Sequence, residues 1–310
     1  MSFGSGFLRF PDLFPGRRSG EPWGDRAVAL DVAGGPYLFS GLSPLQEEAV
    51  RHRFAGLCRD GGDAAAPVVP VTSRVFRAPA SDFLEIDVRG WEYTLDMEHG
   101  PGSMRLAGLR LMARLDWTPA LAGGLWTSEA AGEEWTSVFE NWFRVLAAYR
   151  LLEESGVVLH SAGVTDGTSA WLLLGPSGAG KSTSSRLCLE RGATVLSDDL
   201  NAVFLDAGGG ARLARLPFTG DLAGLPGGPA AYPLKAVLRL AQGTEDRLRP
   251  LTPAAALASL VAAAPFVNRD PWRREALLAP LERLARSVPA WELTFSLGGG
   301  IWDILRTLNA

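Results

Sequence analysis

The stretch from Gly175 to Ser182 has the residue types and the spacing of a phosphate-binding loop. Its sequence, GPSGAGKS, fits the P-loop pattern G-x-x-x-x-G-K-[ST] and follows a short apolar run, Trp171–Leu174. Glycines let the backbone N–H groups of such a loop turn toward an anion, and the next helix offers its positive N-terminal end. We therefore expect Lys181 to contact the outer phosphates of a nucleotide and the Ser182 hydroxyl to hold Mg²⁺. The residues expected to bind the cofactor are Gly175, Ser177, Gly178, Ala179, Gly180, Lys181, Ser182 and Thr183.

Lysine is rare in this chain, which makes the lysine of the loop informative. The 30 basic residues include only two lysines, Lys181 and Lys235. With 36 glycines in the chain, glycine pairs at P-loop spacing arise easily by chance, but a lysine at the required position does not. A glycine turn that matches the pattern by accident remains the alternative, and the lysine disfavours it.

Two adjacent carboxylates, Asp198 and Asp199, follow the next apolar run after the loop, Ala193–Leu196. Strands that run parallel bring their ends to one edge of a sheet, where ligands bind in open α/β folds. Beside Mg²⁺ and a triphosphate, one carboxylate can bind the metal while the other accepts a proton from an attacking hydroxyl. The alternative is a solvated Asp-Asp pair at a turn.

The three histidines of the chain are weaker candidates than the carboxylates. His160 closes the apolar run Val157–Leu159 ahead of the P-loop strand, and from the residues alone a packed histidine without chemistry is equally well supported. We expect His52 to lie exposed on a helix and His99 to lie exposed at a turn. Only His160 is therefore kept as a candidate for the site.

Composition limits the classes of function. The chain has 310 residues, 47% of them hydrophobic, which is enough for one large or two ordinary domains with real cores. A formal net charge of −4 leaves no general basic field for nucleic acid. No apolar run approaches the roughly 20 residues of a membrane span, and the N-terminus lacks a secretory signal. The two cysteines suggest neither a disulfide framework nor a zinc site. We expect a soluble cytoplasmic protein without nucleic-acid or membrane partners.

The hydrophobic pattern predicts three regions along the chain. Residues 1–131 are expected to form an α+β N-terminal domain that binds substrate or partner. Residues 132–156 read as an amphipathic helix with an aromatic stripe that connects the two halves. Residues 157–310 alternate strands and helices around the P-loop and are expected to form the kinase domain.

Several finer features are expected inside these regions. In the first, Ser43 starts a helix with a capping box and a buried stripe that includes Leu45, and the period-two pattern between Val68 and Trp126 predicts an antiparallel meander. That meander includes strands over Phe83–Val88 and Trp91–Leu95. In the last region we expect a turn near Gly163–Gly167, a Gly/Pro-rich substrate flap or plain connection over Thr219–Pro229, and a helix starting at Asp270-Pro271 that kinks or splits at Pro280.

The chemistry-bearing residues together resemble the catalytic core of HPr kinase/phosphorylase and of the HPr-kinase-related kinases. The resemblance runs from His160 to Val203. It rests on a histidine 15 positions before Gly175, on the P-loop, and on an Asp-Asp pair that begins 17 positions after Lys181. It implies an α/β fold whose P-loop core is shared with phosphoenolpyruvate carboxykinases, with ATP and Mg²⁺ as cofactors. It also implies a homo-oligomer by analogy.

The same resemblance implies a role for each residue of the core. Asp198 would be the general base toward the acceptor hydroxyl, and His160 would tune or orient it. Asp199 and Ser182 would bind Mg²⁺, and Lys181 keeps the catalytic role toward the phosphates that the P-loop pattern gives it. The roles of Asp198, His160 and Asp199 come from the family and not from the spacing itself.

The resemblance has a limit downstream. Bifunctional HPr kinases carry a glycine-rich, glutamate-containing signature after the core, and Arg212–Phe218 stands here instead. Phosphorylase activity and HPr as substrate are therefore not expected. In the first half, Phe39–Ser43 with its following helix resembles HPr-kinase-related proteins encoded with ribosomal peptide natural products, including kinases that phosphorylate a serine of lasso-type peptides.

The sequence thus predicts an ATP-dependent phosphotransferase that acts on a hydroxyl, such as a serine of a peptide or protein. Two other classes stay open. One is a P-loop kinase of a small molecule, which would have a pocket too closed for a peptide. The other is a nucleotide-binding scaffold or regulatory protein, which would bind ATP without transferring phosphate. Arg212 or Arg215 is a further candidate for a phosphate contact.

Overall fold

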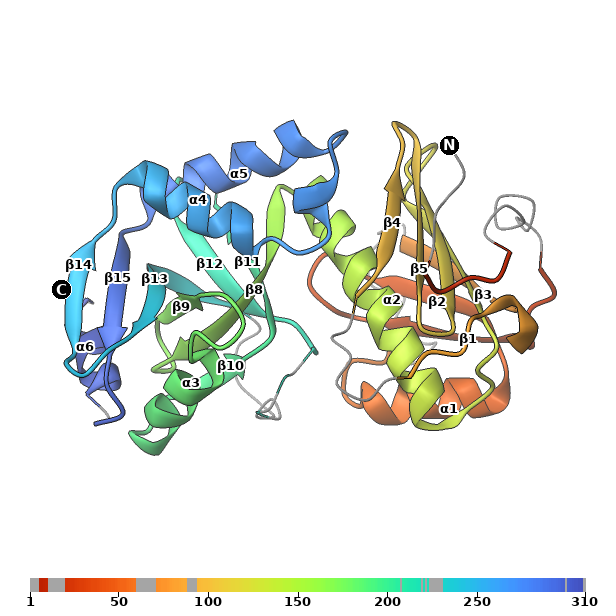
Figure 1. Ribbon diagram of the computed structural model, residues 1–310, viewed down its shortest axis with the longest axis horizontal. Coiled ribbons are helices and arrows are strands. Elements are labelled where there is room, and N and C mark those ends of the chain that lie inside the picture. The colour runs from red at the N-terminus through yellow and green to blue at the C-terminus, as the bar shows by residue number, and fades with distance from the viewer. Residues whose placement is uncertain are drawn as a thin grey trace. The chain divides into compact units, whose positions relative to one another are not determined.

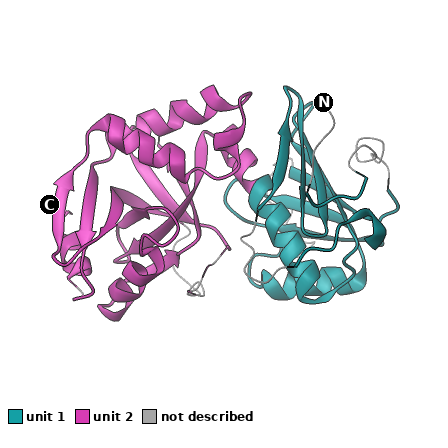
Figure 2. Ribbon diagram, in the orientation of Figure 1, with its two compact units in different colours: residues 1–146 teal, residues 147–310 magenta. Residues whose placement is uncertain are grey.

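The computed structural model (Figure 1) describes residues 6–10, 20–59, 71–87, 94–206, 208–218, 220, 222, 231–298 and 300–308. The chain divides into two compact units, residues 1–146 and residues 147–310 (Figure 2). The boundary falls inside helix α2 (Gly132–Glu153). The helix expected over residues 132–156 is therefore present, and its two ends belong to different units. Among the described residues, no helix combines the length and the apolar character needed to cross a membrane.

Unit 1 contains a seven-stranded mixed sheet in the order β1-β2-β3-β7-β6-β5-β4. Its strands are β1 (Arg26–Leu30), β2 (Tyr37–Leu42), β3 (Val71–Arg77), β4 (Asp96–His99), β5 (Ser103–Gly108), β6 (Leu111–Asp116) and β7 (Ala122–Thr127). Strands β4 to β7 pair antiparallel in chain order, which is the predicted meander. Strand β3 departs from that prediction because it pairs in parallel with both β2 and β7.

The prediction of a strand over Phe83–Val88 is wrong for residues 83–87, which are the described part of this segment. The chain there forms a short 3₁₀ helix (Ala80–Asp82) and then a segment with a single β-bridge, from Phe83 to Leu8. Phe83 is buried in a second core on unit 1, together with Phe7 and Leu8 among others, so the apolar residues of this segment cover a sheet and do not extend it. Most of the strand expected over Trp91–Leu95 lies outside the described residues.

Helix α1 (Pro44–Arg53) begins as the sequence predicts. The Ser43 hydroxyl accepts a hydrogen bond from the Gln46 backbone N–H, and the Gln46 side-chain oxygen accepts one from the Ser43 N–H, which completes the capping box. The prediction for Leu45 is wrong, because its side chain is 61% exposed. Gln46 takes the inward direction instead, where its side-chain amide donates to the Glu129 carbonyl and its own carbonyl accepts from the Trp135 indole.

The aromatic stripe of α2 builds the core of unit 1. Phe139 lies 4.6 Å from Phe39 of β2, measured between ring centroids, and 5.7 Å from Phe54 at the end of α1. The Trp142 indole donates to the Ser73 hydroxyl of β3 at 2.8 Å, and both residues are buried. These contacts fasten both helices to the sheet, as the width of the stripe indicated.

Unit 2 is built on a closed ring of five strands within an eight-stranded sheet. Strand β8 pairs with β11, β11 with β12, β12 with β13, β13 with β9, and β9 with β8 again. Strand β10 pairs with β8 outside the ring, and β15 and β14 extend the sheet from β13. The bounds are β8 (Gly156–Thr165), β9 (Ala170–Leu174), β10 (Thr194–Ser197), β11 (Leu200–Leu205), β12 (Ala211–Arg215), β13 (Ala231–Gln242), β14 (Arg247–Pro250) and β15 (Ala290–Phe295).

Strand β8 is longer than predicted, because the turn expected near Gly163–Gly167 begins only after Thr165. Gly163 lies inside the strand, where a Cβ would come within 2.6 Å of the Asn201 side-chain oxygen. A glycine in a strand often marks such a close approach and not a turn. Gly163 therefore leaves space for the Asn201 side chain and does not form a turn.

Four helices pack on unit 2. They are α3 (Lys181–Glu190), α4 (Pro253–Ala263), α5 (Arg274–Ser287) and α6 (Ile301–Thr307), and a 3₁₀ helix spans Val267–Arg269. Figure 1 shows α3 and α6 on one side of the strands and α4 and α5 on the other. The helix expected at Asp270-Pro271 starts only at Arg274, because the Asp270 carboxylate first caps a turn by accepting from the Trp272 N–H. The kink expected at Pro280 does not divide α5, which continues through this residue.

The core of unit 1 gives a first test of this fold. Phe139→Ala should lower the free energy of unfolding by about 3–5 kcal/mol, since it opens a cavity among four other rings. Leu45→Ala should stay within about 0.5 kcal/mol of the parent, because the side chain is mostly in water. Urea unfolding followed by near-ultraviolet circular dichroism measures both. Equal effects from the two variants would contradict the packing described.

Candidate functional site

The loop from Gly175 to Gly180 joins strand β9 to helix α3, which is the context the sequence predicts. Gly178 and Gly180 have φ angles of 76° and 96°, values that side-chain-bearing residues rarely adopt. A Cβ on Gly180 would lie 2.5 Å from the ring of Phe295, whereas one on Gly178 would meet nothing within 4 Å. The loop thus needs glycine for its backbone at both positions and for space at one of them.

Lys181 lies folded against its own loop. Its side chain is buried, and its ammonium donates to the carbonyl oxygens of Gly175 at 2.8 Å and Pro176 at 3.2 Å. Burial lowers the pKa of this ammonium, and the negative charge of Asp199 opposes part of that shift. Phosphate oxygens bear charge and accept hydrogen bonds more strongly than peptide carbonyls, so an anion in the loop would draw the ammonium toward it.

The Asp198-Asp199 turn lies beside the P-loop, because it follows strand β10, which pairs with β8 as β9 does. Strands β9 and β10 both pair antiparallel with β8, so they run parallel to each other and end at the same edge. Leu174, the last residue of β9, pairs with Ser161, and Ser197, the last residue of β10, pairs with Gly163. The P-loop and the carboxylates therefore emerge side by side, as the sequence analysis expected.

Asp198 is the more enclosed of the two carboxylates, at 4% exposure. It accepts hydrogen bonds from the Ser182 hydroxyl at 3.1 Å and from the backbone N–H groups of Gly220 at 3.0 Å and Leu222 at 3.2 Å. The P-loop serine and the carboxylate are thus in direct contact. A hydroxyl and a carboxylate in contact are a suitable pair of oxygen ligands for Mg²⁺.

Asp199 lies beside the histidine. Its carboxylate is 3.7 Å from the His160 Nε2 atom, and the His160 side chain is 48% exposed. The Asp199 carbonyl accepts from the Ser161 N–H at 2.9 Å, which ties the turn to the strand that carries the histidine. A half-exposed histidine next to a carboxylate can meet a ligand that arrives from solvent.

All of the catalytic and metal-binding residues expected from the sequence therefore belong to one edge of unit 2. The resemblance paired Asp198 with His160 and Asp199 with Ser182, whereas the contacts just described join Ser182 to Asp198 and His160 to Asp199. A contact does not by itself assign a chemical role, so the division of labour between the two carboxylates stays a prediction.

The residues present fit a magnesium-nucleotide ligand. The loop and the start of α3 supply backbone N–H groups, an ammonium that can be redirected and a serine hydroxyl, and the turn after β10 supplies the carboxylate of Asp198. Within the described residues there is no group of three or more His, Cys, Asp and Glu side chains that would hold a metal on its own. Mg²⁺ usually takes one or two protein ligands and completes its shell with water and phosphate oxygens, so it needs no such group.

Three contacts of the site were not expected from the sequence. The Gln242 side-chain amide at the end of β13 donates to the Gly178 carbonyl at 2.8 Å, which supports the loop from behind. Gly220 and Leu222 place their N–H groups on Asp198. The Gly/Pro-rich composition singled out their segment, but most of the expected flap, Thr219–Pro229, lies outside the described residues. Arg212, a candidate for a phosphate contact, instead donates to the Ala231 carbonyl of the neighbouring strand.

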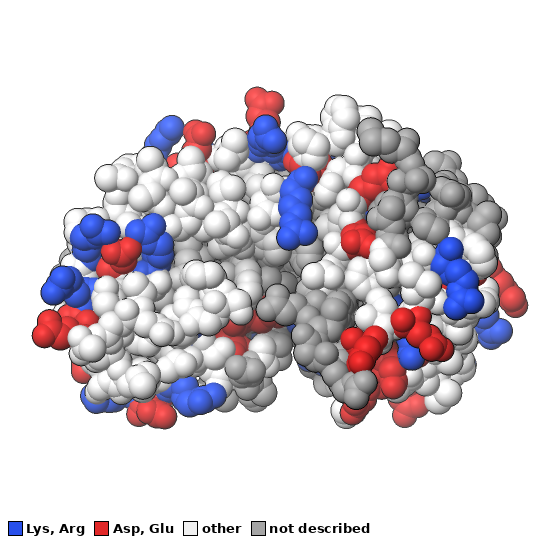
Figure 3. Space-filling model, in the orientation of Figure 1, with Lys and Arg blue, Asp and Glu red and all other residues white. Residues whose placement is uncertain are grey.

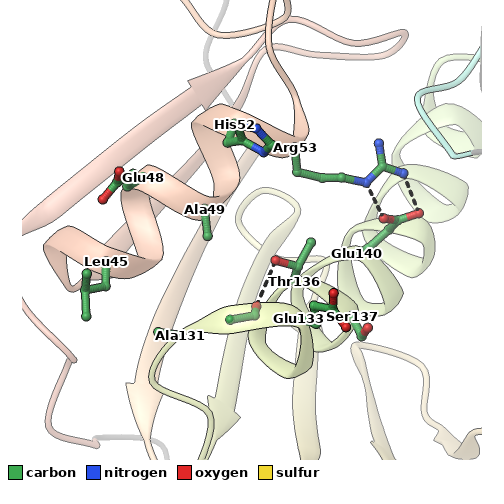
Figure 4. Close-up of a pocket in the computed structure, with 11 residues that line it drawn as sticks. Leu45, Glu48, Ala49, His52, Arg53, Ala131, Glu133, Thr136, Ser137 and Glu140 are labelled. Carbon is green, nitrogen blue, oxygen red and sulfur yellow. Dashed lines mark hydrogen bonds and ion pairs between the residues drawn. The ribbon is translucent and has the colours of Figure 1, made fainter.

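Two hollows in unit 1 include no residue of the loop. One, of about 680 Å³, lies between α1 and the start of α2, with Glu48 and Glu133 on its rim and Arg53 held by Glu140 at 3.0 Å (Figure 4). The other, of about 940 Å³, lies along the start of α2 near Glu85. Figure 3 shows acidic side chains gathered over the part of unit 1 where Figure 1 places α1 and the start of α2.

Comparison with known proteins gives a family and distant structural likenesses. The family model described as SynChlorMet cassette protein ScmC matches residues 128–308, which is more than half of the chain and extends from α2 to α6. The Hpr(Ser) kinase/phosphatase from Coxiella burnetii has a similar structure with a TM-score of 0.29 and 12% sequence identity, over 49% of this chain and 93% of that one. No curated protein matches the sequence.

The two left-handed glycines give a test of the loop that does not depend on any reaction. Gly178→Ala should cost roughly 1–2 kcal/mol of stability through backbone strain alone. Gly180→Ala should cost about 1–3 kcal/mol more, because its methyl group would also press on Phe295. Chemical unfolding of the two variants measures the difference. Equal costs would contradict the contact with Phe295.

Proposed function

Since the chain belongs to the family of the SynChlorMet cassette protein ScmC, whose name states no reaction, we propose its function from the site itself. The proposed function is that of a kinase that uses Mg²⁺ and ATP to phosphorylate a hydroxyl, on a serine of a peptide or protein. The observation that carries it is the contact of Ser182 with Asp198 at 3.1 Å beside the His160-Asp199 pair.

The phosphate end of the proposed site is the loop. When bound, ATP with Mg²⁺ supplies the transferable phosphoryl group and a divalent cation that offsets phosphate charge. The N–H groups of the loop would face the phosphates, and Lys181 would exchange its two carbonyl partners for phosphate oxygens. Ser182 and Asp198 would hold the metal, because they already form one contiguous pair of oxygen ligands.

The acceptor end of the proposed site is Asp199 with His160. As the acceptor oxygen forms its bond to the γ-phosphorus, the bond from that phosphorus to the bridging oxygen would break and ADP would leave, while the proton of the acceptor would move to a carboxylate oxygen of Asp199. His160 would orient that carboxylate, since its Nε2 atom lies 3.7 Å away on the exposed side. This division differs from the one the resemblance implies, and it follows the contacts. The serine acceptor itself rests on the resemblance to kinases of peptides.

The role of Lys181 can be tested against the only other lysine of the chain. Lys181→Met should weaken ATP binding by roughly 10- to 100-fold, the effect of losing a charged hydrogen-bond donor worth about 1.5–3 kcal/mol. Lys235→Met, on the exposed side of β13, should leave the affinity unchanged. Titration with a fluorescent ATP analogue measures both. Unchanged binding in Lys181→Met would remove the loop from the proposal.

The two carboxylates make different predictions, which separate their roles. Asp199→Asn should lower the rate of phosphoryl transfer by about 10²–10⁴-fold with little change in affinity for ATP and Mg²⁺, because it removes only the proton acceptor. Asp198→Asn should remove most of the gain in ATP affinity that Mg²⁺ gives. Asp303→Asn, an exposed site on α6, is the matched control.

Transfer is followed with γ-labelled ATP and a library of serine-containing peptides. The reverse pattern, with Asp198→Asn abolishing transfer and keeping the metal effect, would restore the roles that the resemblance implies. ATP binding by the parent protein without transfer to any peptide or metabolite would favour a scaffold over a kinase.

A further inference from the structure

Beneath the two carboxylates lies a buried polar cluster that has no part in the roles above. It consists of Ser161, Ser197 and Asn201, each 0% exposed, and is called here the Asn201 network. The Asn201 side-chain Nδ2 atom lies 2.9 Å from the Ser161 carbonyl oxygen, 3.1 Å from the Ser161 hydroxyl and 3.2 Å from the Ser197 carbonyl oxygen. One amide group therefore joins strand β8 to the end of strand β10.

Ser197 carries the network into the turn itself. Its hydroxyl donates to the Phe218 carbonyl at 2.7 Å and accepts from the N–H groups of Asp199 at 3.1 Å and Leu200 at 3.2 Å. The Ser197 hydroxyl thus fixes the backbone of the Asp198-Asp199 turn. The same hydroxyl reaches the segment that precedes Gly220, whose N–H group contacts Asp198.

Each member of the network lies within two positions of a residue of the proposed site. Ser161 follows His160, Ser197 precedes Asp198, and Asn201 follows Asp199 by two positions. A shift of any one of them would move a neighbouring catalytic or metal-binding side chain. The contact between the His160 and Asp199 side chains and the contact between Ser182 and Asp198 are therefore set from within the ring.

Core stability alone does not explain an asparagine at this position. Buried polar groups favour folding only when they are hydrogen-bonded, and apolar residues of similar size often stabilise a core as well or better. The Asn201 Oδ1 atom is buried with no hydrogen-bond partner among the described residues, so this residue carries an uncompensated cost. Turning the amide over would place that oxygen against two carbonyl oxygens, so the orientation is determined by its neighbours.

Gly163 completes the arrangement by leaving room for the amide. A Cβ at this position would lie 2.6 Å from the Asn201 Oδ1 atom and 3.1 Å from its Cγ atom. The network thus uses a glycine inside strand β8 as well as an asparagine in β11. Gly163 and Asn201, two residue types that are uncommon inside strands, therefore contact each other next to the site.

We propose that Asn201 is a positioning residue, which holds the Asp198-Asp199 turn in register with His160 through the Asn201 network. The expected effect of Asn201 on kcat rests on the proposed kinase function. Its expected effect on the backbone of the turn does not. Asn201 touches no reactant. It acts by fixing the backbone on both sides of the residues that do.

The test compares Asn201→Leu with Val203→Ala. Leucine has a similar size and lacks the donors, while Val203 is a buried residue two positions further along the same strand. In the nucleotide-free protein, Asn201→Leu should speed hydrogen exchange of the Asp199 and Leu200 amides at least tenfold, and Val203→Ala should not. Unchanged exchange in Asn201→Leu, or an equal increase in both variants, would overturn the positioning role.

The catalytic consequence is read from the steady-state constants with γ-labelled ATP and the serine-peptide library. Asn201→Leu should lower kcat at least tenfold and leave the affinity for ATP measured without Mg²⁺ within twofold, since the loop from Gly175 to Lys181 is untouched. Val203→Ala should keep kcat near the parent value. A loss of this Mg²⁺-free ATP affinity equal to the loss in kcat would indicate general disruption and overturn the proposal. If the parent protein transfers no phosphate, the kinase function fails while hydrogen exchange still decides the role of Asn201.

A second variant, Gly163→Ala, tests the same network if Asn201→Leu fails to fold. Gly163→Ala should produce the same loss in kcat and the same faster exchange, because its methyl group displaces the Asn201 amide. Added to Asn201→Ala, it should have little further effect, since the Asn201 Oδ1 and Cγ atoms are then gone and the Leu213 Cδ2 atom, at 3.1 Å, is the end of a side chain that can shift. Full additivity of the two changes would show that Gly163 does not act through Asn201.

Discussion

The arrangement of unit 2 depends on one electrostatic constraint. The carboxylates of Asp198 and Asp199 lie near the buried ammonium of Lys181, and each charge that leaves water needs a partner. Charges removed from water are tolerated only when they are paired and hydrogen-bonded. Asp198 meets this requirement with three donors, and the charge of Asp199 acts on Lys181 and lies near His160. The closed ring of strands provides the geometry, because β9 and β10 flank β8 and end together.

Local features of the structure could be predicted from the sequence, because they depend on residue type and short spacing. The glycine, lysine and serine of the P-loop and the capping box at Ser43 are of this kind, and both lie where the sequence places them. Features that depend on distant partners could not. Leu45 was expected inside, but buried Gln46 takes its place by bonding to a carbonyl 83 positions away. Gly163 was expected in a turn, but it faces Asn201 across the ring.

The pairing of the carboxylates illustrates the same limit. The sequence places Asp198 and Asp199 in one turn, but successive residues point in different directions, and only the fold decides which one faces Ser182. The contacts give Asp198 to the serine and Asp199 to the histidine. Family resemblance names residues that the structure brings together at this edge, whereas the assignment of individual roles needs the backbone that the ring imposes.

The central claim is that this edge of unit 2 transfers a phosphoryl group to a serine hydroxyl. The most direct measurement is incubation of the purified protein with γ-labelled ATP, Mg²⁺ and a cell extract, followed by partial acid hydrolysis and identification of the labelled amino acid. The account predicts labelled phosphoserine that requires Mg²⁺ and is absent with α-labelled ATP. Label that appears only as free phosphate, or none at all from a protein that binds ATP, would contradict it.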